Sequence, residues 1–263
     1  MLRSEGGVSI ARTGLDGVAL KPTECDVGRG VDLDCDVLTI DYEGRANLPN
    51  AETLRALASG EGKLQVTTPI RADGFDPLGD DSLSRSLPSA ARRVLVAGHS
   101  AYLSEAERTR QVAPRLRAAR ERAPDAWVGT DGIERVALAA GGTQFELLSR
   151  TTLDDVRSLR DAGFEGPIAV YAPTVLTADD NEILDAVGEY VSRRKPVARA
   201  LLEGTTTDRR ATGRGRTVLL AASDDYALCG TPQDVREQVA ELEAAGVDSV
   251  IGYPARGIEE FLG

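Results

Sequence analysis

The sequence predicts a parallel (β/α)8 barrel, and two observations lead to this prediction. The first is a set of eight short apolar runs that read as strands: residues 17–22, 36–42, 63–70, 93–98, 126–129, 144–149, 167–173 and 248–254. The second is that a helical pattern follows most of these runs. Uninterrupted apolar strands that alternate with helices indicate a parallel sheet, and eight such units in about 250 residues fit one closed barrel. A doubly wound open sheet is the alternative architecture.

The length and composition of the chain fit one large domain. With 263 residues, of which 41% are apolar, the chain can bury a substantial core, and we expect a single barrel domain over residues 1–263. Two polar, glycine-containing stretches, residues 73–89 and 204–216, read as mobile loops within this domain and not as domain boundaries.

Three helices are predicted in the first two thirds of the chain. The first covers residues 50–58, after the second strand, and the next is a long Arg- and Glu-rich amphipathic helix over residues 104–122. A third is expected over residues 151–162, where Thr152 can cap the helix and Asp155 follows three residues later.

The last helix has the clearest signals at both ends. Thr231 is the expected N-cap, Pro232 takes the first helical position, Asp234 completes a capping box, and Gly246 ends the helix. Its apolar stripe consists of Val235, Val239, Leu242 and Ala245. This spacing predicts that one face of the helix packs against the barrel.

The net charge of the chain makes some classes of binding partner unfavourable. The formal net charge is −11, from 42 acidic and 31 basic residues, and this negative field would repel nucleic acid and anionic membrane surfaces. Only Lys21, Lys63 and Lys195 are lysines, so arginine supplies nearly all of the positive charge. Excess carboxylates with arginine in place of lysine indicate a halophilic archaeon with a GC-rich genome. An ordinary acidic bias is the alternative explanation.

Cysteine usage and hydropathy point to a cytoplasmic protein without a metal centre. Cys25, Cys35 and Cys229 are odd in number, widely spaced and accompanied by one histidine, so neither a disulfide framework nor a zinc site is expected. No N-terminal apolar region resembles a signal peptide, and no segment approaches the roughly 18 apolar residues that read as a membrane span.

Two segments of the C-terminal half resemble a known superfamily. AWVGTDGIERVALAAGGTQFELLS (residues 126–149) is similar to the sixth-strand region of the luciferase-like flavin and deazaflavin oxidoreductases. DDYALCGTPQDVREQVAELEAAGVDSVIGYPARGIEEFLG (residues 224–263) resembles their terminal signature, in which a helix that begins with GTP leads to the eighth strand. Among these enzymes, the methylene-tetrahydromethanopterin reductases are the most similar, including a G-x-P after the last strand.

The resemblance implies a luciferase-like barrel with a shortened N-terminal half. It also implies hydride transfer between a deazaflavin (coenzyme F420) or FMN and a small cytosolic substrate, and a possible homodimer. The Asp-His pair that usually follows the family's second strand reads Asp41-Tyr42 in this chain. Because hydride transfer needs mainly positioning and the cofactor carries the difficult chemistry, a missing histidine does not exclude an oxidoreductase.

The strand ends supply the candidate site residues, because loops and helix N-termini meet at the C-terminal mouth of a barrel. The polar residues there are Lys21, Glu24, Asp41, Tyr42, Glu43, Thr67, Thr68, Arg71, His99, Ser100, Tyr102, Thr130, Asp131, Ser149, Arg150, Tyr171, Thr174, Tyr253 and Arg256. From this ring we assign Lys21, Arg71 and Tyr253 to substrate binding. Loop residues are commonly polar, so the ring by itself does not establish a ligand.

Two residues are the candidates for acid-base chemistry. His99 is the only histidine and therefore the one side chain expected to titrate near neutral pH without help from its surroundings. Asp41 could orient a substrate or the Tyr42 hydroxyl. The alternatives are a hydrogen-bonded structural histidine and an aspartate that caps a loop.

The turn GTDG is the candidate phosphate cradle. Gly129, Thr130, Asp131 and Gly132 precede a helix, and backbone N–H groups at such a turn can hold an anion. The Asp131 carboxylate would repel a phosphate, and an ordinary strand-to-helix turn remains the alternative.

Two other functions remain open. One is a degenerate luciferase-like barrel that has lost its reaction and binds no cofactor, acting as a binding or structural protein. It predicts that Arg71, Tyr102 or Tyr253 fills the mouth and leaves no cavity of about 300 Å³. The other is a barrel enzyme that binds a sugar phosphate or another small anion without a flavin.

Overall fold

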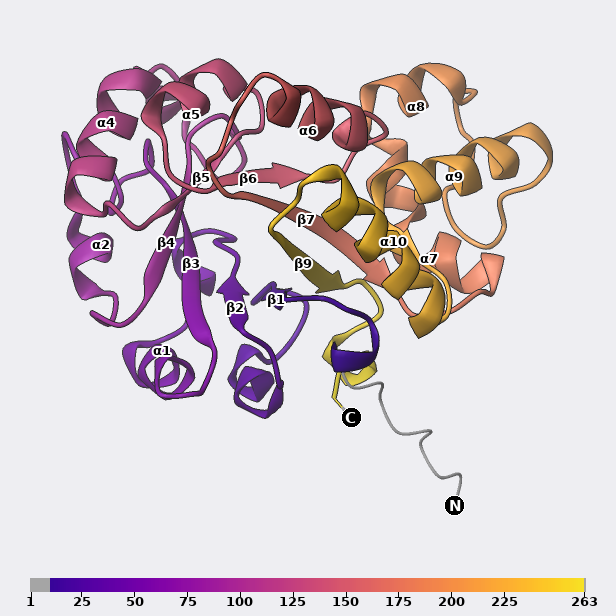
Figure 1. Cartoon of the computed structure of the whole chain (residues 1–263), viewed down its shortest axis with the longest axis horizontal. Coiled ribbons are helices and arrows are strands. Elements are labelled where there is room, and N and C mark those ends of the chain that lie inside the picture. The colour runs from indigo at the N-terminus through magenta and orange to yellow at the C-terminus, as the bar shows by residue number, and fades with distance from the viewer. Residues whose placement is uncertain (1–9, 263) are drawn as a thin grey trace.

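A computed structural model describes residues 10–262, and these form a closed parallel barrel surrounded by helices (Figure 1). Residues 1–9 and 263 of the expected domain lie outside the described part of the chain. The eight barrel strands are β1 (Gly17–Leu20), β2 (Val37–Ile40), β3 (Lys63–Pro69), β4 (Arg92–Val96), β5 (Trp127–Gly129), β6 (Gln144–Leu147), β7 (Ile168–Val175) and β9 (Ser249–Pro254). Each of them coincides with one of the eight predicted runs.

Strand pairing closes the sheet. Strands β1 to β7 pair in sequence order, β7 pairs with β9, and β9 returns to β1, where Gly17 faces Ile251. All of these pairings are parallel, so the (β/α)8 prediction is confirmed and the doubly wound open sheet is wrong. A further two-residue strand, β8 (Leu228–Cys229), pairs with the end of β7.

The helices lie between the strands and cover the outside of the barrel (Figure 1). They are α1 (Ala51–Ala58), α2 (Ser82–Ser86), α3 (Glu105–Arg108), α4 (Val112–Arg122), α5 (Glu134–Ala140), α6 (Thr152–Asp161), α7 (Asp180–Ser192), α8 (Lys195–Ala200), α9 (Gly213–Tyr226) and α10 (Pro232–Ala245). Four short 3-10 helices are η1 (Ile10–Arg12), η2 (Val27–Asp32), η3 (Arg45–Asn47) and η4 (Ile258–Glu260). The connection from β7 to β9 is the longest, since it contains α7, α8, α9 and α10.

The predicted long helix over residues 104–122 is wrong, because the chain breaks there into α3 and α4. In one continuous helix, Pro114 could not donate to the carbonyl of Arg110, and its ring would clash with that carbonyl. Starting α4 at Val112 places Pro114 in the first turn, where no intrahelical partner is needed. The carbonyl of Arg108, at the end of α3, instead accepts a hydrogen bond from Arg71 at 3.0 Å.

The capping predictions have different outcomes at α6 and α10. Thr151, not Thr152, is the N-cap of α6, and the Thr152 hydroxyl accepts from the Ser149 N–H at 2.9 Å, so that prediction is wrong. The capping box of α10 is confirmed: Thr231 accepts from the Asp234 N–H, and Asp234 accepts from the Thr231 N–H at 2.8 Å. Gly246 ends α10 with a left-handed φ of 111°.

The two stretches that were predicted to be loops each contain a helix or part of one. Helix α2 lies within residues 73–89, and α9 begins at Gly213, inside the stretch 204–216. In the first stretch Asp76 is only 1% exposed, because its carboxylate accepts from Arg115 at 2.9 Å and from Arg110 at 3.2 Å. These two ion pairs connect the loop to Arg115 in α4 and to Arg110 in the segment before it.

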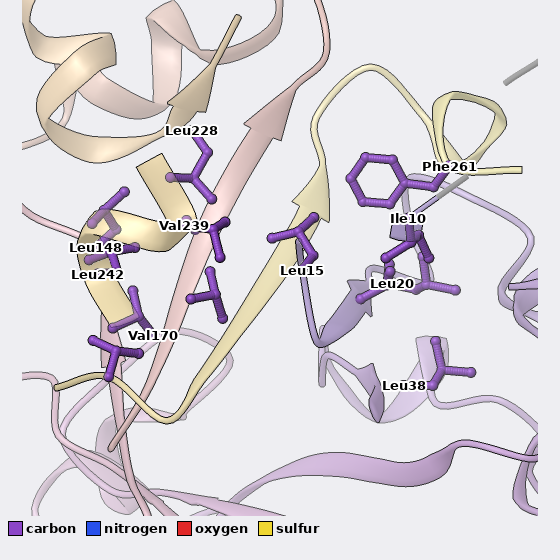
Figure 2. Close-up of a cluster of buried hydrophobic side chains, with 14 of the residues drawn as sticks. Ile10, Leu15, Leu20, Leu38, Leu148, Val170, Leu228, Val239, Leu242 and Phe261 are labelled. Carbon is purple, nitrogen blue, oxygen red and sulfur yellow. The ribbon is translucent and has the colours of Figure 1, made fainter. Parts of the chain in front are cut away.

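Apolar side chains form one layer inside the barrel and another between barrel and helices. Figure 2 shows part of the outer layer, where Val239 and Leu242 of α10 lie near Val170 of β7 and Leu148. The predicted stripe of α10 is buried, as its spacing indicates. The inner layer takes alternate residues of the strands: Ala19, Val37, Val94, Trp127, Phe145, Ala169, Tyr171, Ile251 and Tyr253. Its rings form the base on which the strand-end site lies.

No helix within residues 10–262 is long and apolar enough to cross a membrane.

Candidate functional site

A cavity of about 290 Å³ lies at the C-terminal mouth of the barrel, and we call it the mouth cavity. Its walls come from the ends of strands β2 to β7, from β1 through Lys21 and from α7 through Tyr190. The lining residues are Lys21, Asp41, Tyr42, Glu43, Thr67, Pro69, Val96, Gly98, His99, Ala101, Tyr102, Gly129, Asp131, Phe145, Leu147, Tyr171 and Tyr190. The volume is close to the lower end of the range for small-molecule sites. The blocked mouth expected of a degenerate barrel is therefore not found.

A carboxyl–phenol pair, Asp41 and Tyr171, contributes to the lining of this cavity. Asp41 directly follows β2, and its N–H donates to the carbonyl of Leu20 at 2.9 Å, so its backbone is held by β1. The Tyr171 hydroxyl donates to Oδ2 of Asp41 at 3.4 Å. The two residues thus connect β2 and β7 across the mouth.

Burial dominates the ionisation of this pair. It raises the pKa of Asp41 to about 6; Lys21 opposes the rise, Glu43 adds to it, and the Tyr171 hydrogen bond opposes it. Burial, followed by the neighbouring Asp41 carboxylate, raises the pKa of Tyr171 well above 10. Tyr171 therefore stays protonated at neutral pH, while Asp41 can gain or lose a proton within the physiological range.

Lys21 is the cation of the mouth cavity, and protein groups surround it. Its ammonium lies 3.3 Å from a Glu24 carboxylate oxygen and 3.9 Å from the centre of the Tyr253 ring. Tyr253 is 7% exposed and stacks on Tyr171 with ring centres 6.4 Å apart. Of the three residues assigned to substrate binding, Lys21 lines the cavity, whereas Tyr253 lies outside its lining and contacts Lys21.

Aromatic rings make up much of the wall. Tyr42 contacts Tyr102 edge-on at 6.2 Å and Phe75 at 5.3 Å, and its N–H donates to the Thr67 hydroxyl at 2.5 Å. Tyr102 is 53% exposed and adopts a left-handed φ of 61°. Phe145 packs edge-on against Tyr171 at 6.0 Å. Such walls provide flat apolar surfaces for a planar ligand.

His99 lines the cavity from an exposed position after β4. Its Nδ1 accepts a hydrogen bond from the Ala101 N–H at 3.3 Å. In the neutral ring this bond places the proton on Nε2, which is then the nitrogen available to a ligand.

Arg71 does not line the cavity. Its guanidinium donates to the carbonyls of Arg108 at 3.0 Å and of Gly98 and His99 at 3.3 Å, and the residue is only 8% exposed. These bonds hold in place the segment that carries His99 and Tyr102. The structure thus places Arg71 behind the wall, where its contacts are with backbone.

The turn GTDG lies at the edge of the cavity, and three N–H groups at the turn are engaged, while that of Asp131 donates to no protein group within residues 10–262. Thr130 donates to the carbonyl of Phe145 at 3.0 Å, Gly132 to a Glu134 carboxylate oxygen at 3.0 Å, and Ile133 to the carbonyl of Thr130 at 2.9 Å. Gly129 and Asp131 line the cavity. This geometry favours the ordinary turn over an open phosphate cradle. The segment also follows the fifth barrel strand, so its assignment to a sixth strand is wrong.

A second cavity of about 570 Å³, which we call the side cavity, adjoins the first and shares Asp131 and Leu147 with it. Its lining residues are Thr130, Asp131, Glu134, Leu138, Glu146, Leu147, Leu148, Ser149, Thr151, Thr152, Asp155, Ser158, Leu159 and Arg194. Burial, then Asp155 and Glu134, raises the pKa of Glu146. Four carboxylates face one guanidinium there, so the side cavity is acidic.

Several lining residues were not assigned a role from the sequence. Tyr171, Glu43 and Tyr102 belong to the strand-end ring, and their position near the end of a predicted strand was the one sequence feature that pointed to the site. Glu43 is held by Thr23, whose N–H donates to it at 2.8 Å. Tyr190 comes from α7, a helix in the long connection after β7, and no strand-end pattern points to it. Within residues 10–262, no group of three or more His, Cys, Asp or Glu side chains could hold a metal ion.

The closed parallel sheet with its surrounding helices defines a (β/α)8 barrel, and a cavity lies at its C-terminal mouth. The chain belongs to a family of unknown function, DUF7388, whose sequence profile matches residues 10–261. No curated protein matches the sequence.

Several solved structures share the fold, including two F420-dependent enzymes. The coenzyme F420 dependent tetrahydromethanopterin reductase from Methanopyrus kandleri is similar over 93% of this chain and 94% of its own, with a TM-score of 0.63 and 14% identity. An F420-dependent secondary alcohol dehydrogenase, in complex with an F420-acetone adduct, is similar over 94% of this chain and 97% of its own, with a TM-score of 0.58 and 10% identity. At these identities the likeness shows the barrel fold alone.

Proposed function

We propose that this protein is a luciferase-like oxidoreductase that holds a flavin- or deazaflavin-type ring in the mouth cavity and acts on a small substrate. The observation that carries the proposal is the cavity itself: a ring-sized space with tyrosine and phenylalanine walls and an ionisable carboxyl–phenol pair. The F420-dependent solved structures with the same fold support the choice of ring.

The residues present fit the ring system. Tyr42, Tyr102 and Phe145 offer apolar surfaces that exclude water from a planar ligand. When bound, a flavin or deazaflavin ring would supply hydride chemistry. Asp41 would hold or release a proton at its carboxylate, Tyr171 would orient that carboxylate, and the Nε2–H of His99 would donate a second hydrogen bond.

A titration with riboflavin, FMN and coenzyme F420 tests this proposal. We expect quenching or a spectral shift of the ring at a Kd of about tens of micromolar or tighter. Tyr102→Ala, at an exposed wall position, should weaken binding by roughly two- to tenfold, the worth of one aromatic contact. Leu202→Ala is the control, because Leu202 is 79% exposed and lies outside both cavities. The absence of any spectral change with all three compounds would count against the proposal.

A binding protein without catalytic activity is the second candidate. The engaged N–H groups of Thr130, Gly132 and Ile133 favour it, because they leave only the Asp131 N–H at this turn to anchor the phosphate of a catalytic cofactor. A protein of this kind would bind the ring yet fail to oxidise or reduce any small alcohol, aldehyde or pterin when the ring's absorbance is followed over time.

A further inference from the structure

We propose that the ligand of the mouth cavity carries no phosphate or other anionic tail, and that it is an uncharged heteroaromatic ring bearing a polyol. The inference rests on the proposed function and specifies its ligand class. Three features of the site support it: the hydrogen bonding of the GTDG turn, the engagement of nearby cations and the distribution of carboxylates.

Backbone N–H groups are the first feature. Phosphate sites at strand-to-helix turns depend on N–H groups that point at the anion and on the positive end of a long helix. At GTDG the N–H of Gly132 already binds the Glu134 carboxylate, and those of Thr130 and Ile133 bind carbonyls. Helix α5, which follows, has only seven residues. Glu134 thus already satisfies the Gly132 N–H, a donor that a phosphate at this turn would need.

The cations near the two cavities are the second feature. Lys21 is paired with Glu24 and lies over Tyr253, and Arg71 donates to three carbonyls. Arg194, in the side cavity, lies 4.2 Å from the centre of the Tyr190 ring and donates to the Tyr190 hydroxyl. Drawing Lys21 to a phosphate would break its pairing with Glu24, and drawing Arg194 would break its contacts with Tyr190, although the Nε atoms of Arg71 and Arg194 have no hydrogen-bond partner in the described part of the chain.

Carboxylates are the third feature. Asp41, Glu43 and Asp131 line the mouth cavity, and Asp131 also lines the side cavity together with Glu134, Glu146 and Asp155. A ligand tail that leaves the mouth cavity towards the side cavity must pass Asp131, because this residue and Leu147 are common to both. Carboxylates repel a phosphate there, but they accept hydrogen bonds from hydroxyl groups.

The volume of the mouth cavity and the hydroxyl groups of the side cavity agree with a ligand that carries a polyol. The mouth cavity, at about 290 Å³, has room for a ring and little more. The side cavity offers the hydroxyls of Ser149, Thr151 and Thr152 beside its carboxylates. A ribityl-type chain can donate to the carboxylates and accept from these hydroxyls without bringing in negative charge.

Matched pairs of ligands test the inference. Riboflavin and FMN differ by one phosphate, and the uncharged ribityl-deazaflavin and coenzyme F420 differ by the whole anionic tail. We expect the uncharged member of each pair to bind at least tenfold more tightly at low salt, and the difference to shrink at about 1 M salt, where charges are screened beyond roughly 3 Å. Equal or tighter binding of the phosphorylated members would overturn this inference while supporting the proposed function. Failure of all four compounds to bind would overturn both.

A charge variant gives a second, independent readout. Asp131→Asn combined with Glu134→Gln removes two carboxylates, while Gln keeps an oxygen that can accept from the Gly132 N–H. We expect the ratio of FMN affinity to riboflavin affinity to rise severalfold in this variant, because both ligands keep amide oxygens as acceptors for their hydroxyls while FMN alone is relieved of two repelling charges. Asp125→Asn is the control, since Asp125 is exposed, precedes β5 at the opposite end of the barrel and lines neither cavity. An unchanged ratio of FMN to riboflavin affinity in the double variant would contradict the inference.

Discussion

The hydroxyl of Tyr171 lies 3.4 Å from Oδ2 of Asp41, and this contact joins the middle of β7 to the end of β2 across the mouth of the barrel. Strands β1 and β9 separate these two strands in the sheet, so the bond spans the cavity instead of linking neighbours. Both side chains line the mouth cavity. A change in the protonation of the pair would therefore change the charge of the cavity wall.

Tyr171→Phe should raise the pKa of Asp41 further above its present value of about 6. The Tyr171 hydrogen bond favours the carboxylate, so its loss favours the protonated acid. NMR titration of the side-chain carboxyl carbons would show the shift. Tyr226→Phe is the control, because Tyr226 is buried in the cluster between α7 and α9. An Asp41 titration that does not move, or that moves to lower pH, would exclude this role for Tyr171.

Asp41→Asn should stabilise the protein at pH 8 by roughly 1 to 3 kcal/mol. The folded-state pKa of Asp41 is raised from 3.8 to about 6, so the folded state holds the proton more tightly than the unfolded chain. The resulting penalty is fully present above pH 6 and disappears as the pH falls below about 4. Denaturant unfolding of both proteins between pH 4 and 8 measures the difference. The prediction fails if the two stability curves run parallel over this range.

Arg71→Ala should lower the free energy of unfolding by about 2 to 4 kcal/mol, since three carbonyls lose a charged donor. Amide hydrogen exchange should rise in residues 98–108, which those bonds hold in place. Arg71→Lys preserves the charge but cannot reach all three carbonyls, so we expect a smaller change in the same direction. Weakened ligand binding with unchanged stability and exchange would instead indicate that Arg71 contacts the ligand directly, as the strand-end position alone suggested.

Gly132→Ala should cost about 1 kcal/mol of stability and leave riboflavin binding unchanged. The φ of Gly132 is 71°, which strains any side chain, although a Cβ there would meet no atom within 4 Å. Gly132→Asp should behave similarly, because the turn is not expected to hold a phosphate. Thermal unfolding and ligand titration measure the two effects. Loss of riboflavin binding in either variant would show that the turn contributes to the site after all.

Much of the barrel follows from local sequence signals. The eight strands were found from apolar runs, and the ends of α10 from Thr231, Asp234 and Gly246, because burial and capping act over a few neighbouring residues. The prediction over residues 104–122 failed where such signals compete. The amphipathic pattern continues through Pro114, but the helix does not.

The location of the candidate site also follows from the sequence, since parallel strands in a barrel all end at one mouth. Which strand-end residues face that mouth was decided by tertiary contacts. Asp41, His99 and Lys21 line the cavity, whereas Arg71 is drawn to the carbonyls of Gly98, His99 and Arg108, and Tyr253 stacks on Tyr171.

The sequence by itself determined the barrel, its strand order and the end at which a ligand would enter. Only the tertiary structure decided the chemistry at that end. Tyr171 reaches Asp41, 130 residues away. The strand and helix patterns are periodic and depend on neighbours, whereas this bond depends on side-chain directions that are set when the whole barrel closes.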